Sequence, residues 1–220
     1  MSLLLLFLDE LKGYAKSKIM IVLWFGLPLL SFFIQFINPD ELEGIPISFL
    51  VSLVVSSIGG TLSAIMLSTS IVSEKNRHVY ELFLIRPVRR SSLILAKYLA
   101  VYLCLVIAVS ISLTVGLIID VFTGDLIENY LDITFESLII GISSMSITCS
   151  IGIFFGVLVS SVPVAAILSV YLGSQLSTII ILPTIFFEIL DPVILALTLG
   201  VTITLIMMSV NVLLFSRKQF

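Results

Sequence analysis

The chain has 220 residues, of which 59% are hydrophobic and 11% are charged, with a formal net charge of −3 and a mean hydropathy of +1.26. One soluble core could not bury this much apolar side chain, so the composition excludes a soluble enzyme and makes lipid the expected main solvent. Nucleic acid is not an expected partner. We therefore expect an all-α membrane protein embedded in the lipid bilayer.

Six apolar runs are long enough to cross a bilayer, which takes about 20 residues of helix. None of them contains Asp, Glu, Lys, Arg or His. The predicted transmembrane helices cover residues 19–37, 47–73, 98–119, 137–159, 164–187 and 193–215. The second run would form about 40 Å of helix against an apolar core of about 30 Å, so it must tilt or project into the cytoplasm.

The basic residues divide the connections into two kinds. Lys and Arg occur only before the first run, between the second and third, and after the sixth, whereas the alternate connections hold ten acidic residues. Because Lys and Arg favour the cytoplasmic side, both termini and the loop at residues 74–97 are predicted to be cytoplasmic. The turn at residues 160–163 carries no charge, and it is predicted to be cytoplasmic only because successive spans cross the membrane in alternate directions. The expected location is the plasma membrane of a prokaryote, with 1–220 forming a single transmembrane domain.

Residues 1–18 carry an apolar stripe at helical spacing, opposite Asp9, Lys12 and Lys16, which predicts a helix lying in the cytoplasmic interface. The stripe consists of Leu4, Phe7, Leu8, Leu11, Tyr14 and Ala15. The 74–97 loop also contains an amphipathic segment. Residues 74–85 predict a short helix with Val79, Leu82 and Phe83 on one face. Pro87 then disfavours helix in the residue before it.

Small residues recur every four positions in three of the runs and predict close helix packing, within one chain or between two. The ridges are Ser144, Thr148, Gly152, Gly156 and Ser160; Ala165, Ser169, Gly173 and Ser177; and Ser56, Gly60 and Ala64. Three polar residues in or near the runs, Gln35, Gln175 and Asn211, are candidates either for a substrate pathway or for helix–helix hydrogen bonds. The glycines at 152, 156 and 173 are candidates for the same two roles.

No catalytic, cofactor-binding or metal-binding motif is evident. The sequence has one histidine, His78, and no G-x-x-x-x-G-K-[ST] phosphate loop, so this chain is not expected to hydrolyse ATP by that route or to be an enzyme. The runs also lack the ionisable groups that proton-coupled carriers use. If the chain moves a substrate, the energy is expected to come from another chain, although sodium coupling through carbonyls and hydroxyls stays open.

The stretch IVSEKNRHVYELFLIRPVRRSSLILAKYL, at residues 71–99, resembles the cytoplasmic segment of ABC type-2 permeases, the membrane subunits of ATP-driven exporters. The matching residues are Glu74 and Lys75 at the start, Glu81 and Leu82, Pro87 and Val88, and the final Lys97. The chain departs from the family pattern at His78, Val79 and Tyr80, where a Gly-Thr is common, and at Ala96, where a Gly often precedes the Lys.

The resemblance implies that residues 74–85 form a coupling helix that docks into an ABC ATPase subunit, with residues 2–18 as an elbow helix. The implied ATPase-coupling residues are Glu74, Lys75, Val79, Glu81, Leu82, Phe83, Pro87 and Lys97. It also implies a second transmembrane subunit, most simply another copy of this chain, and ATP and Mg on the ATPase. Two other classes stay open: a non-transporting scaffold or immunity-type protein, and an ion-coupled secondary carrier.

Overall fold

The computed structural model describes residues 3–37, 47–77, 90–123, 130–186 and 191–217. Within these ranges every regular element is an α-helix, which confirms the all-α prediction. The helices are α1 Leu3–Ala15, α2 Lys18–Ile37, α3 Ile47–Asn76, α5 Arg90–Thr123, α6 Tyr130–Leu158, α7 Val162–Phe186 and α8 Pro192–Arg217.

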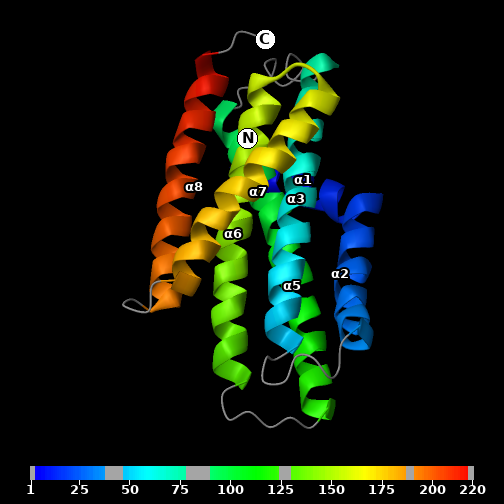
Figure 1. Ribbon diagram of the computed structural model, residues 1–220. Helices are drawn as coiled ribbons and strands as arrows, with labels where there is room; N and C mark the ends of the chain where they lie inside the picture. The colour runs from blue at the N-terminus through cyan, green and yellow to red at the C-terminus, as the bar shows by residue number, and fades with distance from the viewer. Residues whose placement is uncertain (1–2, 38–46, 78–89, 124–129, 187–190, 218–220) are drawn as a thin grey trace.

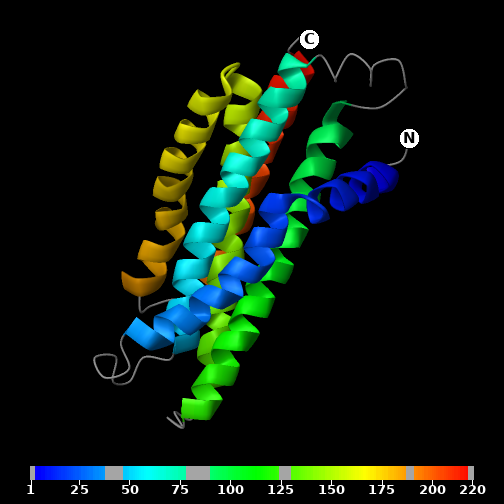
Figure 2. The same cartoon turned by 90° about the vertical axis from the view of Figure 1, so that its right-hand side faces the viewer.

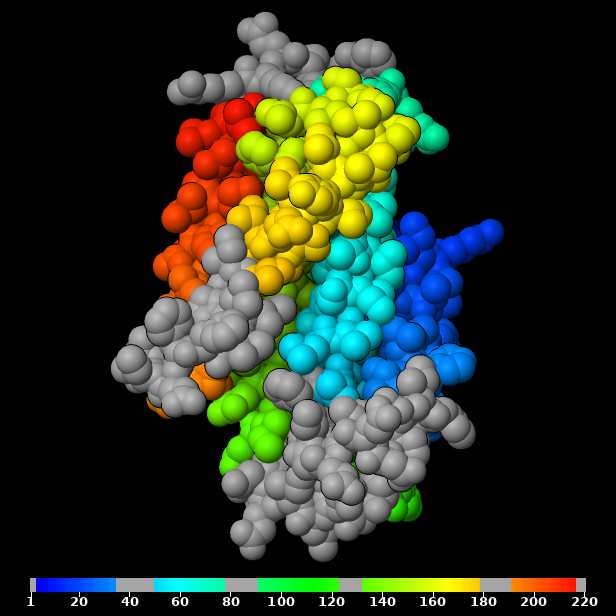
Figure 3. Space-filling model, viewed as in Figure 1, coloured from blue at the N-terminus to red at the C-terminus, as the bar shows by residue number. Residues whose placement is uncertain are grey.

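The six longer helices form an up-and-down bundle (Figure 1). Helices α2, α5 and α7 run down in this view, and α3, α6 and α8 run up, so the end of α3, the start of α5 and the end of α8 lie at one end. Figure 2 shows α1 leaving the bundle sideways near that end. In the space-filling view, α7 lies across the front of the bundle beside α3 (Figure 3).

Four of the described helices are long and apolar enough to cross a membrane: α3, α5, α6 and α8. α1 and α2 pass the same test only as a pair bent by 67°, which gives up to five candidate spans. In α7 the stretch Val162–Thr178 is apolar but shorter. The fold therefore defines a multi-pass helical membrane protein, while the count of six spans and the cytoplasmic side of each terminus stay predictions.

Two helices are longer than the apolar runs that predicted them. α5 continues to Thr123 and α6 begins at Tyr130, so much of the acidic segment expected as an external loop at residues 120–136 is helical. Asp120, expected in that loop, is a buried residue of α5. The prediction ended each helix at its first acidic residue, but the backbone hydrogen bonds of a helix continue through such residues, and Asp120 is buried within the protein.

The small-residue ridges predicted in three runs meet in the centre of the bundle. Gly60 in α3 lies against Thr148 in α6, and Gly152 lies against the backbone of Ala64. α7 joins them through a hydrogen bond of 3.1 Å between the hydroxyl oxygens of Ser68 and Ser169. Without side chains in the way, the backbones approach closely, which is the main source of packing energy when lipid is as apolar as the helices. These ridges thus pack helices within one chain.

Hydrogen bonds from hydroxyl and indole groups join α2 to α5. Ser112 Oγ donates to the Leu27 carbonyl oxygen at 3.0 Å and lies 3.1 Å from Ser31 Oγ. Trp24 Nε1 donates to the Cys104 carbonyl oxygen at 3.2 Å. Pro28 lies within α2 and cannot donate a backbone hydrogen bond, and the contact of Ser112 with the Leu27 carbonyl oxygen lies next to it.

α1 is a helix, as predicted, and the face that packs on the bundle differs in part from the apolar stripe. Leu6, which interrupts the predicted stripe, is buried together with Tyr14, whereas Leu4 is 63% exposed and Leu8 is 40% exposed. The packed face therefore includes only part of the stripe, in which Phe7 and Leu11 are partly buried against the core. We attribute the difference to Glu10, which lies on the packed face because its partner is inside the bundle.

Candidate functional site

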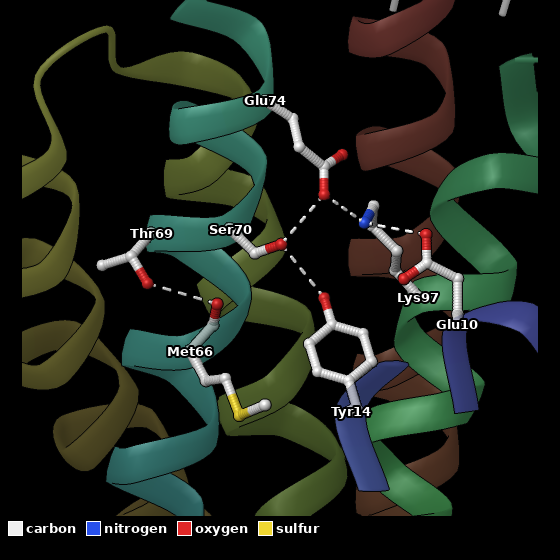
Figure 4. A network of polar contacts seen from close by, with 7 residues as sticks. All are labelled: Glu10, Tyr14, Met66, Thr69, Ser70, Glu74 and Lys97. Carbon is white, nitrogen blue, oxygen red and sulfur yellow. Dashed lines mark hydrogen bonds and ion pairs between the residues drawn. The ribbon is translucent and has the colours of Figure 1, made fainter. Parts of the chain in front are cut away.

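Five polar residues from three helices meet where α3 ends and α5 begins (Figure 4). Lys97 Nζ lies 2.6 Å from Glu74 Oε1 and 2.9 Å from Glu10 Oε1. Ser70 Oγ donates to the same Glu74 oxygen at 3.1 Å, and Tyr14 OH donates to Ser70 Oγ at 3.1 Å. We call Glu10, Tyr14, Ser70, Glu74 and Lys97 the Lys97 cluster.

The helices supply these groups at helical spacing. Glu10 and Tyr14 lie four residues apart on one face of α1, and so do Ser70 and Glu74 on α3, since residues four apart are neighbours on a helix surface. Lys97 lies two turns into α5, and its long side chain reaches the carboxylates of both α1 and α3. Its ammonium is also 5.8 Å from the centre of the Tyr14 ring, within the range of a cation–π contact.

The Lys97 side chain is almost fully buried, with 4% of its surface exposed, whereas Glu10 and Glu74 are 25% and 26% exposed. Burying a single ammonium without a partner would be very costly, so Lys97 requires at least one carboxylate. Two carboxylates and one ammonium leave the cluster with a formal charge of −1. Burial raises the pKa of the Glu10 carboxyl above its ordinary value, and the nearby Lys97 opposes that rise.

The end of α3 is also held on its other side. Lys75 Nζ donates to Ser160 Oγ at 3.3 Å, and Asn76 Nδ2 donates to the Ser160 carbonyl oxygen at 3.2 Å. Ser160 belongs to the turn between α6 and α7, which the sequence placed on the cytoplasmic side by parity alone. The structure puts this turn at the same end of the bundle as the last turn of α3. The end of α3 is thereby tied to α1, α5 and the α6–α7 turn.

The structure brings together only part of the predicted ATPase-coupling set. Glu74 and Lys97 pair with each other, and Lys75 lies in the same last turn of α3. Glu74–Asn76 continue α3 and are not the start of a separate short helix, because the helix runs unbroken to Asn76. The remaining predicted residues lie outside the described part of the chain: Val79, Glu81, Leu82, Phe83 and Pro87.

The sequence did not single out Glu10, Tyr14 or Ser70. A signal was available for Glu10, since it is the acidic residue of the predicted interfacial helix that lies off the polar face formed by Asp9, Lys12 and Lys16. A carboxylate displaced toward the protein face of a helix indicates a basic partner. Which base it would pair with depends on tertiary packing.

The candidate pathway residues differ in their surroundings. Asn211 in α8 is buried and donates through Nδ2 to the Ser150 carbonyl oxygen of α6 at 2.8 Å, so it links two helices. Gln175 is exposed on α7, and the side chain of Gln35 lies outside the described residues. Gly156 lies against Ile71 and Ser68 of α3. A Cβ at position 173 would lie 3.7 Å or more from Thr148 and Ala64, which is ordinary van der Waals contact.

Within the described ranges, no group of three or more His, Cys, Asp or Glu side chains is placed to hold a metal ion. The Lys97 cluster joins three helix ends to one another through ion pairs and hydrogen bonds. Neither the family models nor the curated proteins compared with this chain contain a match.

Proposed function

We propose that this chain is the transmembrane subunit of an ABC exporter in a prokaryotic plasma membrane, working as a pair of subunits with ATPase partners that hydrolyse ATP with Mg. The loop between α3 and α5 receives the movement of the ATPase, and the bundle alternates access to its unidentified substrate. The bundle itself supplies no energy.

The observation that carries the proposal is the pairing of Glu74 with Lys97 at the two ends of this loop. Both residues belong to the loop motif that resembles ABC type-2 permeases. A loop that transmits force needs fixed ends, because movement at a flexible end would be absorbed before it reached the helices. The salt bridge of 2.6 Å fixes the end of α3 to the start of α5.

The amphipathic character of the loop gives a second line of support. Val79, Leu82 and Phe83 recur at the spacing of one helix face beside charged residues. An amphipathic helix presented to water suits a groove on a protein partner. Arg77, the last described residue before the loop continues, is exposed.

The test is copurification of the chain with an ABC ATPase subunit from the same cells, followed by reconstitution in liposomes. We expect Phe83→Ala to reduce the ATPase recovered by at least tenfold, because the apolar anchor of the docking segment is removed. His78→Ala, in the same loop but off that face, serves as the control. Uphill transport by the chain alone on an ion gradient would favour the secondary carrier, and no transport with or without ATPase would favour the scaffold.

A further inference from the structure

The cluster joins α1 to α3, although these two helices share little backbone packing. α1 packs mainly against α5 and only slightly against α2. Its links to the end of α3 are the chain of hydrogen bonds from Tyr14 to Ser70 and the ion pairs from Glu10 through Lys97 to Glu74. The association of α1 with α3 therefore depends on the side chains of the cluster.

The outward face of α1 offers little else to hold it in place. Leu4 is 63% exposed and Leu5 is 53% exposed, and Asp9 and Lys12 are exposed as well, so the side turned away from the bundle suits a lipid–water interface and does not pack on protein. Lipid contacts do not fix a helix at one position along the protein, because neighbouring lipids are equivalent. The directional contacts of α1 are those of Glu10 and Tyr14.

We propose that Lys97 is a positioning residue that makes α1, the end of α3 and the start of α5 one moving body, so that a displacement applied at the end of α3 is passed through α1 to α2. This inference rests on the proposed function. Separating Lys97 from either carboxylate would leave a poorly solvated charge, so the three helix ends stay together when one of them is pulled.

The connection between α1 and α2 is short, and the two helices meet at an angle. α1 ends at Ala15 and α2 begins at Lys18, with the two helix axes at 67°. Ser17 Oγ accepts from the Met20 backbone N–H at 3.2 Å, which caps the start of α2. A shift of α1 along its own axis would therefore push the start of α2 sideways, across the face of α5 to which α2 is bonded through Ser112.

The experiment measures two spin-label distances in the purified full-length chain with its ATPase partner. Labels at Gly13 and Arg77, both exposed, report α1 against α3, and labels at Gly13 and Ser216 report α1 against α8. In the parent protein we expect a narrow Gly13 to Arg77 distribution that ATP plus vanadate leaves unchanged. The Gly13 to Ser216 distance should shift on the same treatment.

Glu10→Ala is the informative variant, because it removes the ion pair that joins α1 to Lys97, while Lys97 keeps Glu74 and Tyr14 keeps its hydrogen bond to Ser70. We expect the Gly13 to Arg77 distribution to become at least twice as broad, and the Gly13 to Ser216 distance to lose its response to ATP plus vanadate. Asp9→Ala is the matched control, since Asp9 is the neighbouring carboxylate and is exposed. It should behave as the parent protein.

Labels at Arg77 and Ser216 separate the two proposals. If this distance changes with ATP plus vanadate while the Gly13 to Ser216 distance does not, the loop moves without α1 and the present inference is overturned alone. An unchanged Gly13 to Arg77 width in Glu10→Ala also overturns it. If the Arg77 to Ser216 distance does not respond to nucleotide at all, the exporter function fails, and the inference fails with it.

Discussion

Gly152 in α6 lies directly against the backbone of Ala64 in α3, where a Cβ on residue 152 would stand 2.7 Å from both the Cα and the carbonyl oxygen of Ala64. That separation is well inside normal van der Waals contact, and backbone atoms cannot rotate away as a side chain would. The close approach of α3 and α6 thus depends on the missing side chain of one residue.

We therefore expect Gly152→Ala to lower the free energy of unfolding by up to about 2 kcal/mol, since overpacking a core usually costs about 1 to 3 kcal/mol. The cost should exceed the gain of about 1 kcal/mol that alanine brings in a helix. Thermal unfolding in detergent measures it. Gly26→Ala is the control, because a Cβ there meets nothing within 4 Å. Equal melting temperatures for the two variants would show that the close approach to Ala64 is not what requires a glycine at 152.

Substitutions in the Lys97 cluster are expected to have non-additive effects on the free energy of unfolding. Lys97→Met leaves Glu10 and Glu74 facing each other without the cation, and we expect it to cost about 3 kcal/mol, at the low end for a broken buried pair because the carboxylates are a quarter exposed. Lys97→Met combined with Glu10→Gln and Glu74→Gln should recover part of that loss, since no charge is left unpaired. Chemical denaturation in mild detergent measures the free energy of unfolding of Lys97→Met and of the triple variant. A triple variant less stable than Lys97→Met would argue against direct ion pairing.

Asn211 predicts a small effect on stability. Its Nδ2 makes one interhelical hydrogen bond, worth about 0.6 kcal/mol on average in a membrane. Its Oδ1 is buried and has no hydrogen-bond partner among the described residues, which offsets the gain. Asn211→Leu should therefore change the free energy of unfolding by less than about 1 kcal/mol. If transport falls sharply in this variant while stability holds, Asn211 belongs to the substrate pathway.

Cysteine labelling in intact cells and inverted vesicles can test on which side of the membrane each turn lies. We expect cysteines at Arg77 and Ser161 to react with a membrane-impermeant maleimide only from the cytoplasmic side, and one at Asp191 only from outside. All three positions are exposed. The buried native cysteines, Cys104 and Cys149, should stay unlabelled. Opposite accessibility of Arg77 and Ser161 would rule out six spans, because the structure places their turns at one end of the bundle.

The sequence by itself determined the class of protein and the approximate limits of its helices. Hydropathy and helical periodicity are local properties, and each run of apolar residues closes its own backbone hydrogen bonds in lipid. The spacing of the small residues likewise marked Gly60, Gly152 and Gly156 as contact positions, which they are. Helix ends were less well predicted: acidic residues such as Asp120 ended the apolar run but not the helix.

Only the tertiary structure decided which groups meet. Lys97 pairs with Glu74 across 23 residues of sequence and with Glu10 across a still longer separation, and no local rule connects them. The inward face of α1 also depended on this pairing. A buried ammonium needs a carboxylate beside it. An apolar stripe does not need to pack on protein, because lipid can solvate it.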